Sequence, residues 1–189
     1  MHNNESKITG IAEITGKSIG YIMVIRLETE RLLLEPLSSA CEAIYTHFYT
    51  NADASKSYGG PLTKAAALAR LNTDIGSWEL AGFGVWAIRH KQDGELVGVC
   101  GFWQGKGWPR ELTWWLLPEA RGQGLAQESS LAAVAHAYNS FKWDVVETYM
   151  NDDNIAARTL VERLGGVITN RAKFPDGLMR NIYTIAKPL

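Results

Sequence analysis

The sequence predicts a single α/β domain in which helices flank a mixed, mostly antiparallel sheet. The expected elements follow the order β, α, α, β, β, β, α, β, α, β, β, which is not the regular alternation of strands and helices found in parallel sheets. Residues 83–89 and 95–103 are rich in β-forming residues, and the Asp93-Gly94 pair between them is a strong hairpin signal. An antiparallel meander is therefore expected at the centre of the domain.

One strand and two helices are expected before this hairpin. Residues 26–37 have the apolar content of a strand, and Pro36 disfavours a helix at the residue before it. Ser38 or Ser39 can cap the first helix, and Thr63 can cap a second one whose apolar residues recur at helical spacing. Two helices are therefore expected to follow the first strand.

Four strands and two helices are expected after the hairpin. One helix follows a Gly-rich turn at residues 121–126, and the other begins in the cap-rich segment at 151–154 and ends at Gly165. Trp114 and Trp115 are expected on opposite faces of the sheet, because side chains alternate along a strand. The four expected strands are residues 111–117, 145–150, 167–169 and 181–186.

Composition excludes several classes of protein. Apolar residues make up 46% and charged residues 21% of the 189 positions, as in folded globular chains and unlike disordered ones. The 19 basic residues nearly balance the 20 acidic ones, so no broad positive field is available for nucleic acid or an anionic membrane, and neither partner is expected. Cys41 and Cys100 lack metal-ligand spacing, so no metal is expected either.

Residues 1–25 are expected to be an irregular N-terminal appendage to a domain that comprises residues 26–189. The appendage shows no periodic apolar face, and it lacks the basic start and apolar middle of a secretory signal. No apolar run in the chain approaches the roughly 20 residues that a transmembrane helix needs. These features favour a cytoplasmic protein.

The turn Arg121-Gly122-Gln123-Gly124-Leu125-Ala126 is the first candidate functional site. It precedes an expected helix, where main-chain N–H groups without intrahelical partners and the positive end of the helix dipole attract anions. It lacks the Gly-Lys-Ser/Thr ending of a Walker A loop and the full Gly-x-Gly-x-x-Gly dinucleotide fingerprint. A plain tight turn entering a helix explains these residues equally well. The neighbouring segments must therefore decide between an anion-binding site and a plain tight turn.

The turn and its flanks together resemble the GNAT superfamily of N-acetyltransferases. Its acetyl-CoA motif, Gln/Arg-x-x-Gly-x-Gly/Ala, is matched by Arg121, Gly124 and Ala126. Four flanking segments resemble the RimJ/RimL-like branch of ribosomal-protein N-terminal acetyltransferases: LETERLLL at 27–34, GELVG at 94–98, ELTWWL at 111–116 and the Asn-led helix at 154–165. The resemblance spans about residues 26–187 and implies a GNAT-like acyl-CoA N-acyltransferase fold.

The resemblance also implies a site for acetyl-CoA as co-substrate. In that family the main-chain amides of the motif hold the diphosphate, and backbone groups at the end of the preceding strand pair with the pantetheine arm. An asparagine after the next strand often touches the same arm, although a role as a helix cap is an equal alternative for it. The residues assigned to the cofactor in this way are Leu116, Leu117, Arg121, Gly122, Gln123, Gly124, Leu125, Ala126 and Asn154.

Glu111 is the candidate base. Acyl transfer to an amine requires the neutral amine, and the resemblance implies a catalytic or water-positioning glutamate on this strand. The alternative is a solvated carboxylate at the end of a strand. The tyrosine acid of many members falls on Val161 and a serine on Ala157, so no side-chain acid is expected. A CoA thiolate is still a tolerable leaving group, because thiol pKa values lie near about 8.5.

The leading hypothesis is an enzyme that transfers acetyl from acetyl-CoA to a primary amine, with a protein N-terminus as the first acceptor. One alternative is an acetyltransferase of a small amine or antibiotic, for which an acidic acceptor cleft is expected, whereas the sequence has no long acidic run. Another is a catalytically weak acyl-CoA-binding module, suggested by the missing tyrosine and serine. The sequence is compatible with a homodimer and does not identify the acceptor.

Overall fold

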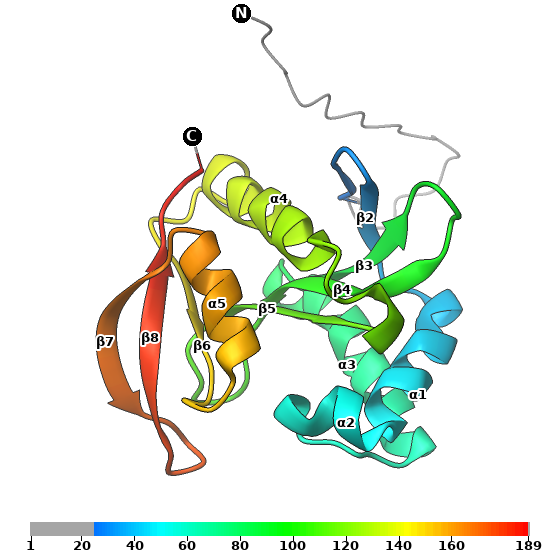
Figure 1. The fold of residues 1–189 in the computed structure, drawn as a ribbon, viewed down its shortest axis with the longest axis horizontal. Coiled ribbons are helices and arrows are strands. Elements are labelled where there is room, and N and C mark those ends of the chain that lie inside the picture. Colours follow the sequence, from blue (N-terminus) through cyan, green and yellow to red (C-terminus); the bar gives the residue numbers. More distant parts are fainter. Residues whose placement is uncertain (1–24, 189) are drawn as a thin grey trace, which may run out of the picture.

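The structure, a computed structural model, describes residues 25–188, so the expected appendage lies outside the described residues except for its last position. In this part of the chain two sheets, all of whose strand pairs are antiparallel, are accompanied by five α-helices (Figure 1). This architecture confirms the fold class predicted from the sequence. No helix within the described range is both long enough and apolar enough to cross a membrane.

The first expected strand is split in two, so the prediction of one strand over residues 26–37 was wrong. β1 (Leu27–Glu28) and β2 (Leu32–Pro36) form an antiparallel hairpin. The Thr29 N–H donates to the Leu32 carbonyl at 3.0 Å, and the Leu32 N–H donates to the Thr29 hydroxyl at 3.0 Å. These two bonds reverse the chain without any glycine or proline that would mark a turn in the sequence.

The helical segment after β2 contains one more helix than expected: α1 (Glu42–Thr50), α2 (Ala52–Ser55) and α3 (Lys64–Ala81). Ser38 caps a short 3-10 turn before α1 by accepting from the Ala40 N–H at 3.3 Å. Thr63 caps α3, as predicted, by accepting from the Ala66 N–H at 3.2 Å. Asn51 caps the single-turn helix α2. This helix is too short to show a helical periodicity in the sequence.

The predicted meander is confirmed by β3 (Val85–His90), β4 (Leu96–Trp103) and β5 (Glu111–Leu116), which complete a sheet of order β1-β2-β3-β4-β5. Helices α1 and α3 cover one face, and α4 (Leu125–Asn139) covers the other (Figure 1). Trp115 stacks on Phe48 of α1 with ring centroids 4.2 Å apart, whereas Trp114 packs against the core on the α4 side. The alternation predicted for the two tryptophans is confirmed.

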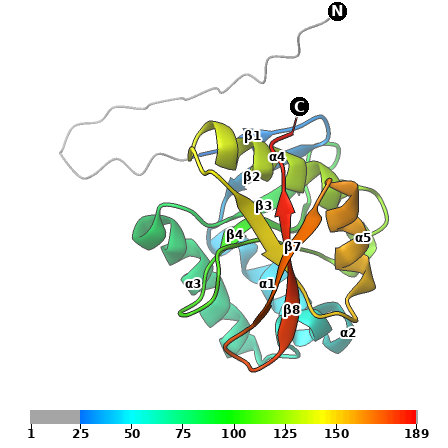
Figure 2. The same ribbon diagram turned by 90° about the vertical axis from the view of Figure 1, so that its left-hand side faces the viewer.

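A second sheet of order β6-β8-β7 follows, and it faces the viewer in Figure 2. Its strands are β6 (Val146–Tyr149), β7 (Val167–Lys173) and β8 (Met179–Ile185), and α5 (Ile155–Arg163) connects β6 to β7. β7 extends well past the predicted end at residue 169, because its polar second half pairs with β8 although it is mostly exposed. Cross-strand pairing therefore extends a strand that composition alone would end early.

The two sheets meet where β5 passes β6. The Thr148 hydroxyl donates to the Leu112 carbonyl at 2.8 Å, and both residues are buried. The edge of β5 that β4 does not cover borders two adjoining cavities, one at the C-terminal end of the strand and one that extends to Glu111 at its start. This edge positions the functional site.

Candidate functional site

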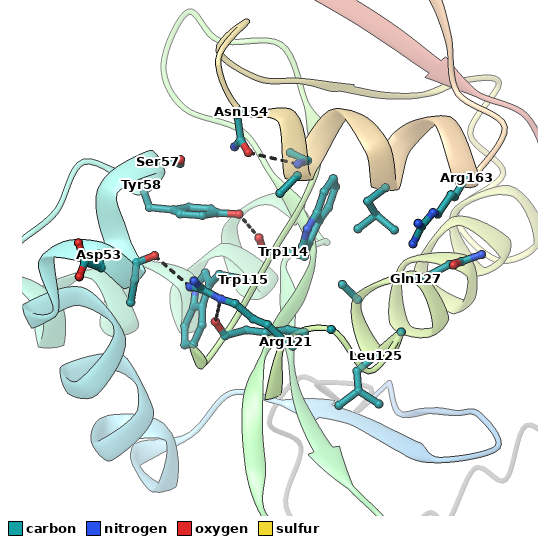
Figure 3. A pocket seen from close by; sticks show the side chains of 18 residues that line it. Asp53, Ser57, Tyr58, Trp114, Trp115, Arg121, Leu125, Gln127, Asn154 and Arg163 are labelled. Atoms are coloured by element: carbon teal, nitrogen blue, oxygen red, sulfur yellow. Dashed lines mark hydrogen bonds between the residues drawn. The ribbon is translucent and has the colours of Figure 1, made fainter. Parts of the chain in front are cut away.

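The first cavity has a volume of about 410 Å³ and is bordered by the C-terminal end of β5, the Gly-rich turn, the start of α4 and one side of α5 (Figure 3). Residues from α2 and the turn after it close the remaining side. The six lining residues of the turn and the start of α4 are Arg121, Gly122, Gly124, Leu125, Ala126 and Gln127.

The turn has the backbone geometry of an anion site. Gly122 and Gly124 adopt left-handed φ angles of 76° and 78°, and α4 begins at Leu125 without a side-chain cap. The first amides of α4 therefore have no intrahelical acceptor and lie at the positive end of the helix. A Cβ on Gly124 would meet only a terminal nitrogen of Arg31, at 3.5 Å, so the backbone angle rather than lack of space requires glycine here.

Arg121 and Gln123 use their side chains within the protein. Arg121 donates through Nε to the Leu116 carbonyl at 3.1 Å and through Nη2 to the Ala54 carbonyl at 3.2 Å, which ties the end of β5 to α2. Gln123 donates to the Glu119 carbonyl at 3.2 Å and does not line the cavity. Arg121 thus holds the shape of the site, and Gln123 lies outside its lining.

Leu117 is less suited than Leu116 to pair with the pantetheine arm. Its N–H donates to the Val97 carbonyl at 2.9 Å, and its carbonyl accepts from the Ala120 N–H at 3.0 Å, so both backbone groups are already used. Hydrogen-bonding direction alternates along an antiparallel strand, so Leu116 and Trp114 present their backbone groups to the open edge instead. The carbonyls of these two residues accept from the side chains of Arg121 and Tyr58, in agreement with this alternation.

The second cavity adjoins the first and has a volume of about 530 Å³. Tyr58, Trp114 and Asn154 line both cavities, so they mark the passage between the two (Figure 3). Asn154 also caps α5 by accepting from the Ala157 N–H at 3.2 Å. The helix-cap role is confirmed, and the position of Asn154 at the passage keeps its amide available to a ligand.

Glu111 lines the second cavity at the start of β5. Burial raises the pKa of its carboxyl to about 8, although the positive charges of Arg70 and Arg180 and the hydroxyl of Tyr149 lower it. A carboxyl with this pKa exchanges a proton near neutral pH, which is the property required of a general base or acid. Glu111 is therefore not the freely solvated carboxylate of the alternative interpretation.

Charged and aromatic side chains line the rest of the second cavity, and sequence reasoning missed most of them. Arg70 comes from α3 and Arg180 from β8, and neither segment carries a motif. Trp103 and Trp108 lie below these two guanidinium groups, with the centroids of their rings 5.5 and 5.4 Å from the respective Cζ atoms. The only sequence signal for Arg70 is its i,i+4 spacing from Asp74.

Departures from the family pattern have structural consequences in α5. Val161 is fully buried in the main core, and Ala157 lines both cavities without a polar atom on its side chain. Tyr58, on the turn after α2, is the phenol that reaches the passage, and burial keeps its pKa above the usual range, so it is a hydrogen-bond donor. Among residues 25–188 no group of three or more His, Cys, Asp or Glu side chains could hold a metal ion.

Residues 31–167 match the model of the family described as the acetyltransferase (GNAT) domain. The matched segment includes the Gly-rich turn, β5, which borders both cavities, and α5. The chain belongs to the GNAT acetyltransferase family. It is thus an acyltransferase enzyme of the group that uses acetyl-CoA. Membership confirms the resemblance drawn from the motif and its flanks.

Solved GNAT structures share the whole fold. An acetyltransferase from Agrobacterium tumefaciens is 27% identical with a TM-score of 0.78, covering 89% of this chain and 98% of its own. A GNAT-family acetyltransferase from Bordetella pertussis is 28% identical with a TM-score of 0.72, covering 85% and 99%. RimL, a ribosomal L7/L12 alpha-N-protein acetyltransferase, is 17% identical with a TM-score of 0.71, covering 89% and 97%, and supports the fold alone.

Proposed function

We propose that this GNAT enzyme transfers the acetyl group of acetyl-CoA to a primary amine that enters the second cavity, with a protein N-terminus as the first candidate acceptor. One observation carries the proposal: the cavity lined by the Gly-rich turn adjoins the cavity lined by Glu111. The two share the wall formed by Tyr58, Trp114 and Asn154. A donor and an acceptor bound in these cavities would meet at that wall.

The first cavity suits acetyl-CoA by its chemistry. The free amides at the start of α4 offer hydrogen bonds to a diphosphate, because they point out of the helix at its positive end. The N–H groups of Trp114 and Leu116 face away from β4 and can bond to an amide-bearing chain in the manner of an added strand, whereas the carbonyls of both residues already accept from Tyr58 and Arg121. These two features support the assignment of Gly122, Gly124, Leu125, Ala126 and Leu116 to acetyl-CoA.

In the proposed reaction the amine nitrogen attacks the thioester carbonyl, a C–N bond forms, and the C–S bond breaks to release the CoA thiolate. The proton lost by the amine passes to Glu111. The pKa of about 8 at Glu111 lies close to the roughly 8.5 of a thiol, so onward transfer of the proton to the thiolate is nearly balanced. This balance removes the need for the tyrosine acid that α5 lacks.

The lining of the second cavity bears on the alternative acceptors. It contains three basic side chains, Lys56, Arg70 and Arg180, and two acidic ones, Glu111 and Asp176. A polyamine or an aminoglycoside carries several positive charges, but of the two carboxyl groups in this lining Asp176 is already paired with Arg180, so several ammonium groups would lack partners here. A protein N-terminus carries a single positive charge, and the branch that the motif flanks resemble, like the RimL neighbour, acts on such termini.

The test is release of CoA thiol from acetyl-CoA with a panel of acceptors: peptides with a free N-terminus, the same peptides with a blocked N-terminus and a lysine, and small amines. We expect turnover with free N-termini and little with the blocked peptides. Turnover with small amines alone would show that the acceptor is a small amine and not a protein N-terminus. Stabilisation by acetyl-CoA in a thermal unfolding assay without turnover on any amine would support the binding-module alternative instead.

A further inference from the structure

The two arginines of the second cavity differ in how fully their guanidinium groups are engaged. Arg180 donates to Asp176 through both terminal nitrogens, at 2.9 and 2.6 Å, and through Nε to Asn151 at 2.8 Å. This fork-to-fork pair leaves Arg180 neutralised, and its side chain is only 8% exposed. Arg180 therefore holds the wall of the cavity together.

Arg70 is held from one side only. Its Nε contacts Asp74 at 3.1 Å, and Asp74, with a side chain 5% exposed, also accepts from the Tyr45 hydroxyl at 2.9 Å. Within residues 25–188 no hydrogen bond engages the two terminal nitrogens of Arg70, and its side chain is 34% exposed. The arginine is thus anchored and oriented, with its outer donors available in the cavity.

Free guanidinium donors in a partly buried cavity suit one class of ligand. A planar pair of N–H donors matches the two oxygens of a carboxylate or phosphate, and such charged bonds are stronger than neutral ones. Trp103, 5.5 Å from the Arg70 guanidinium carbon, supports the flat face of this group. Lys56, which lines the same cavity, adds a second positive charge.

We propose that Arg70 binds an anionic group of the acceptor, so that the preferred substrate is a primary amine that also carries a carboxylate or phosphate. This inference rests on the proposed acetyl transfer and adds the acceptor's second charge to it. The amine of such a molecule lies toward Glu111 and its anionic group toward Arg70, because both residues line one cavity. The anion can belong to a small amino acid or to an acidic side chain near a peptide N-terminus.

The experiment compares acceptors with and without an anionic group, by release of CoA thiol under saturating acetyl-CoA. The small-molecule arm pairs β-alanine with β-alaninamide and phosphoethanolamine with ethanolamine. The peptide arm pairs peptides that begin Ser-Glu and Ser-Gln. We expect kcat/KM to favour the anionic member by about 10- to 100-fold, the usual value of a charge-assisted hydrogen bond, and the arm with the higher kcat/KM identifies the source of the anion.

Variants assign the preference to Arg70. R70Q should bring the ratio of kcat/KM between the anionic acceptor and its neutral partner close to one, and R70K should keep part of the preference. The ratio is the readout because Arg70 also lowers the pKa of Glu111, so its loss changes turnover of both acceptors alike. R171Q is the matched control, because Arg171 is an exposed arginine that pairs with Asp152 outside the cavity lining. The double variant R70Q/D74N tests the same point without an unpaired buried carboxylate if R70Q alone proves unstable.

The possible failures are distinguishable. Equal kcat/KM for anionic and neutral acceptors in the wild-type protein would overturn this inference and leave the acetyltransferase proposal standing. A preference that survives in R70Q would overturn the role of Arg70. Absence of thiol release with every amine would overturn the proposed function, and this inference with it. The wild-type comparison decides the substrate class even if the variants do not fold.

Discussion

Replacing Glu111 with glutamine tests the proposed base directly. The substitution keeps the size of the side chain and removes its ionisation. Burial raises the pKa of Glu111 to about 8 against the opposing effects of Arg70, Tyr149 and Arg180. The carboxyl is therefore mostly protonated at pH 7 and becomes a base only as the pH rises through about 8.

This pKa sets the size and the pH dependence of the effect. The ionised fraction of Glu111 rises from about one tenth at pH 7 to about nine tenths at pH 9. The ratio of kcat/KM between wild type and E111Q should rise about tenfold over this interval and level off at about 10²-fold or more, the usual contribution of a general base. The acceptor amine titrates identically with both proteins, so its ionisation cancels in the ratio.

The assay is CoA thiol release at saturating acetyl-CoA across pH 6 to 9.5, with one acceptor for both proteins. Stabilisation by acetyl-CoA in thermal unfolding confirms that E111Q retains a folded cofactor site. A ratio near one at every pH would show that Glu111 takes no part in proton transfer. A large ratio that does not change with pH would show a base with an ordinary carboxyl pKa, and would refute the argument from burial.

The same substitution has a predicted effect on stability with a definite sign. The pKa of Glu111 is raised from 4.5 in the unfolded chain to about 8 in the folded protein, so between these values only the folded state holds the proton. Wild-type stability should fall as the pH rises through this window, by at most about 1.4 kcal/mol per pH unit. The free energy of unfolding of E111Q relative to wild type should therefore increase from pH 5 to 8, measured by denaturant titration.

Three further outcomes are expected. G124V should lose stabilisation by acetyl-CoA, whereas G82V, at another left-handed glycine with φ 74° and outside both cavity linings, should keep it despite a similar loss of stability. T148V should lower the free energy of unfolding by about 1–3 kcal/mol, because a buried carbonyl on β5 loses its donor, and an unchanged value would mean that the bond does not join the sheets. Deletion of residues 1–22 should leave the midpoint of denaturant unfolding and the acetyl transfer rate nearly unchanged, as the sequence predicts for an appendage, and a large loss of either would assign this segment to the domain.

Features that depend on neighbouring residues were predictable from the sequence. The cap at Thr63, the hairpin at Asp93-Gly94 and the turn at residues 121–126 each have their cause within a few positions of the chain. The placement of Trp114 and Trp115 on opposite faces of the sheet also followed, because alternation along a strand is local. These signals, combined with the resemblance they carry, were sufficient for the fold and the family.

The assignment of backbone groups to the cofactor depended on tertiary structure. Leu117 directly follows β5, which contains Trp114, and only the register with β4 decides which of the two directs its N–H and carbonyl to the open edge. A register is a relation between two strands, so neither strand contains it alone. The sequence alone therefore could not rank Leu117 against Trp114 as a backbone partner of the cofactor.

The chemistry of the second cavity was decided at the same level. The family resemblance identified Glu111 as a candidate base, but its pKa follows from burial and from Arg70 and Arg180, which come from α3 and β8. The sequence determined which groups can ionise and where the glycine-marked turns lie. Only the packed structure determined which of these groups share one low-dielectric cavity, because electrostatic interactions depend on distance through space and on exclusion of water rather than on position along the chain.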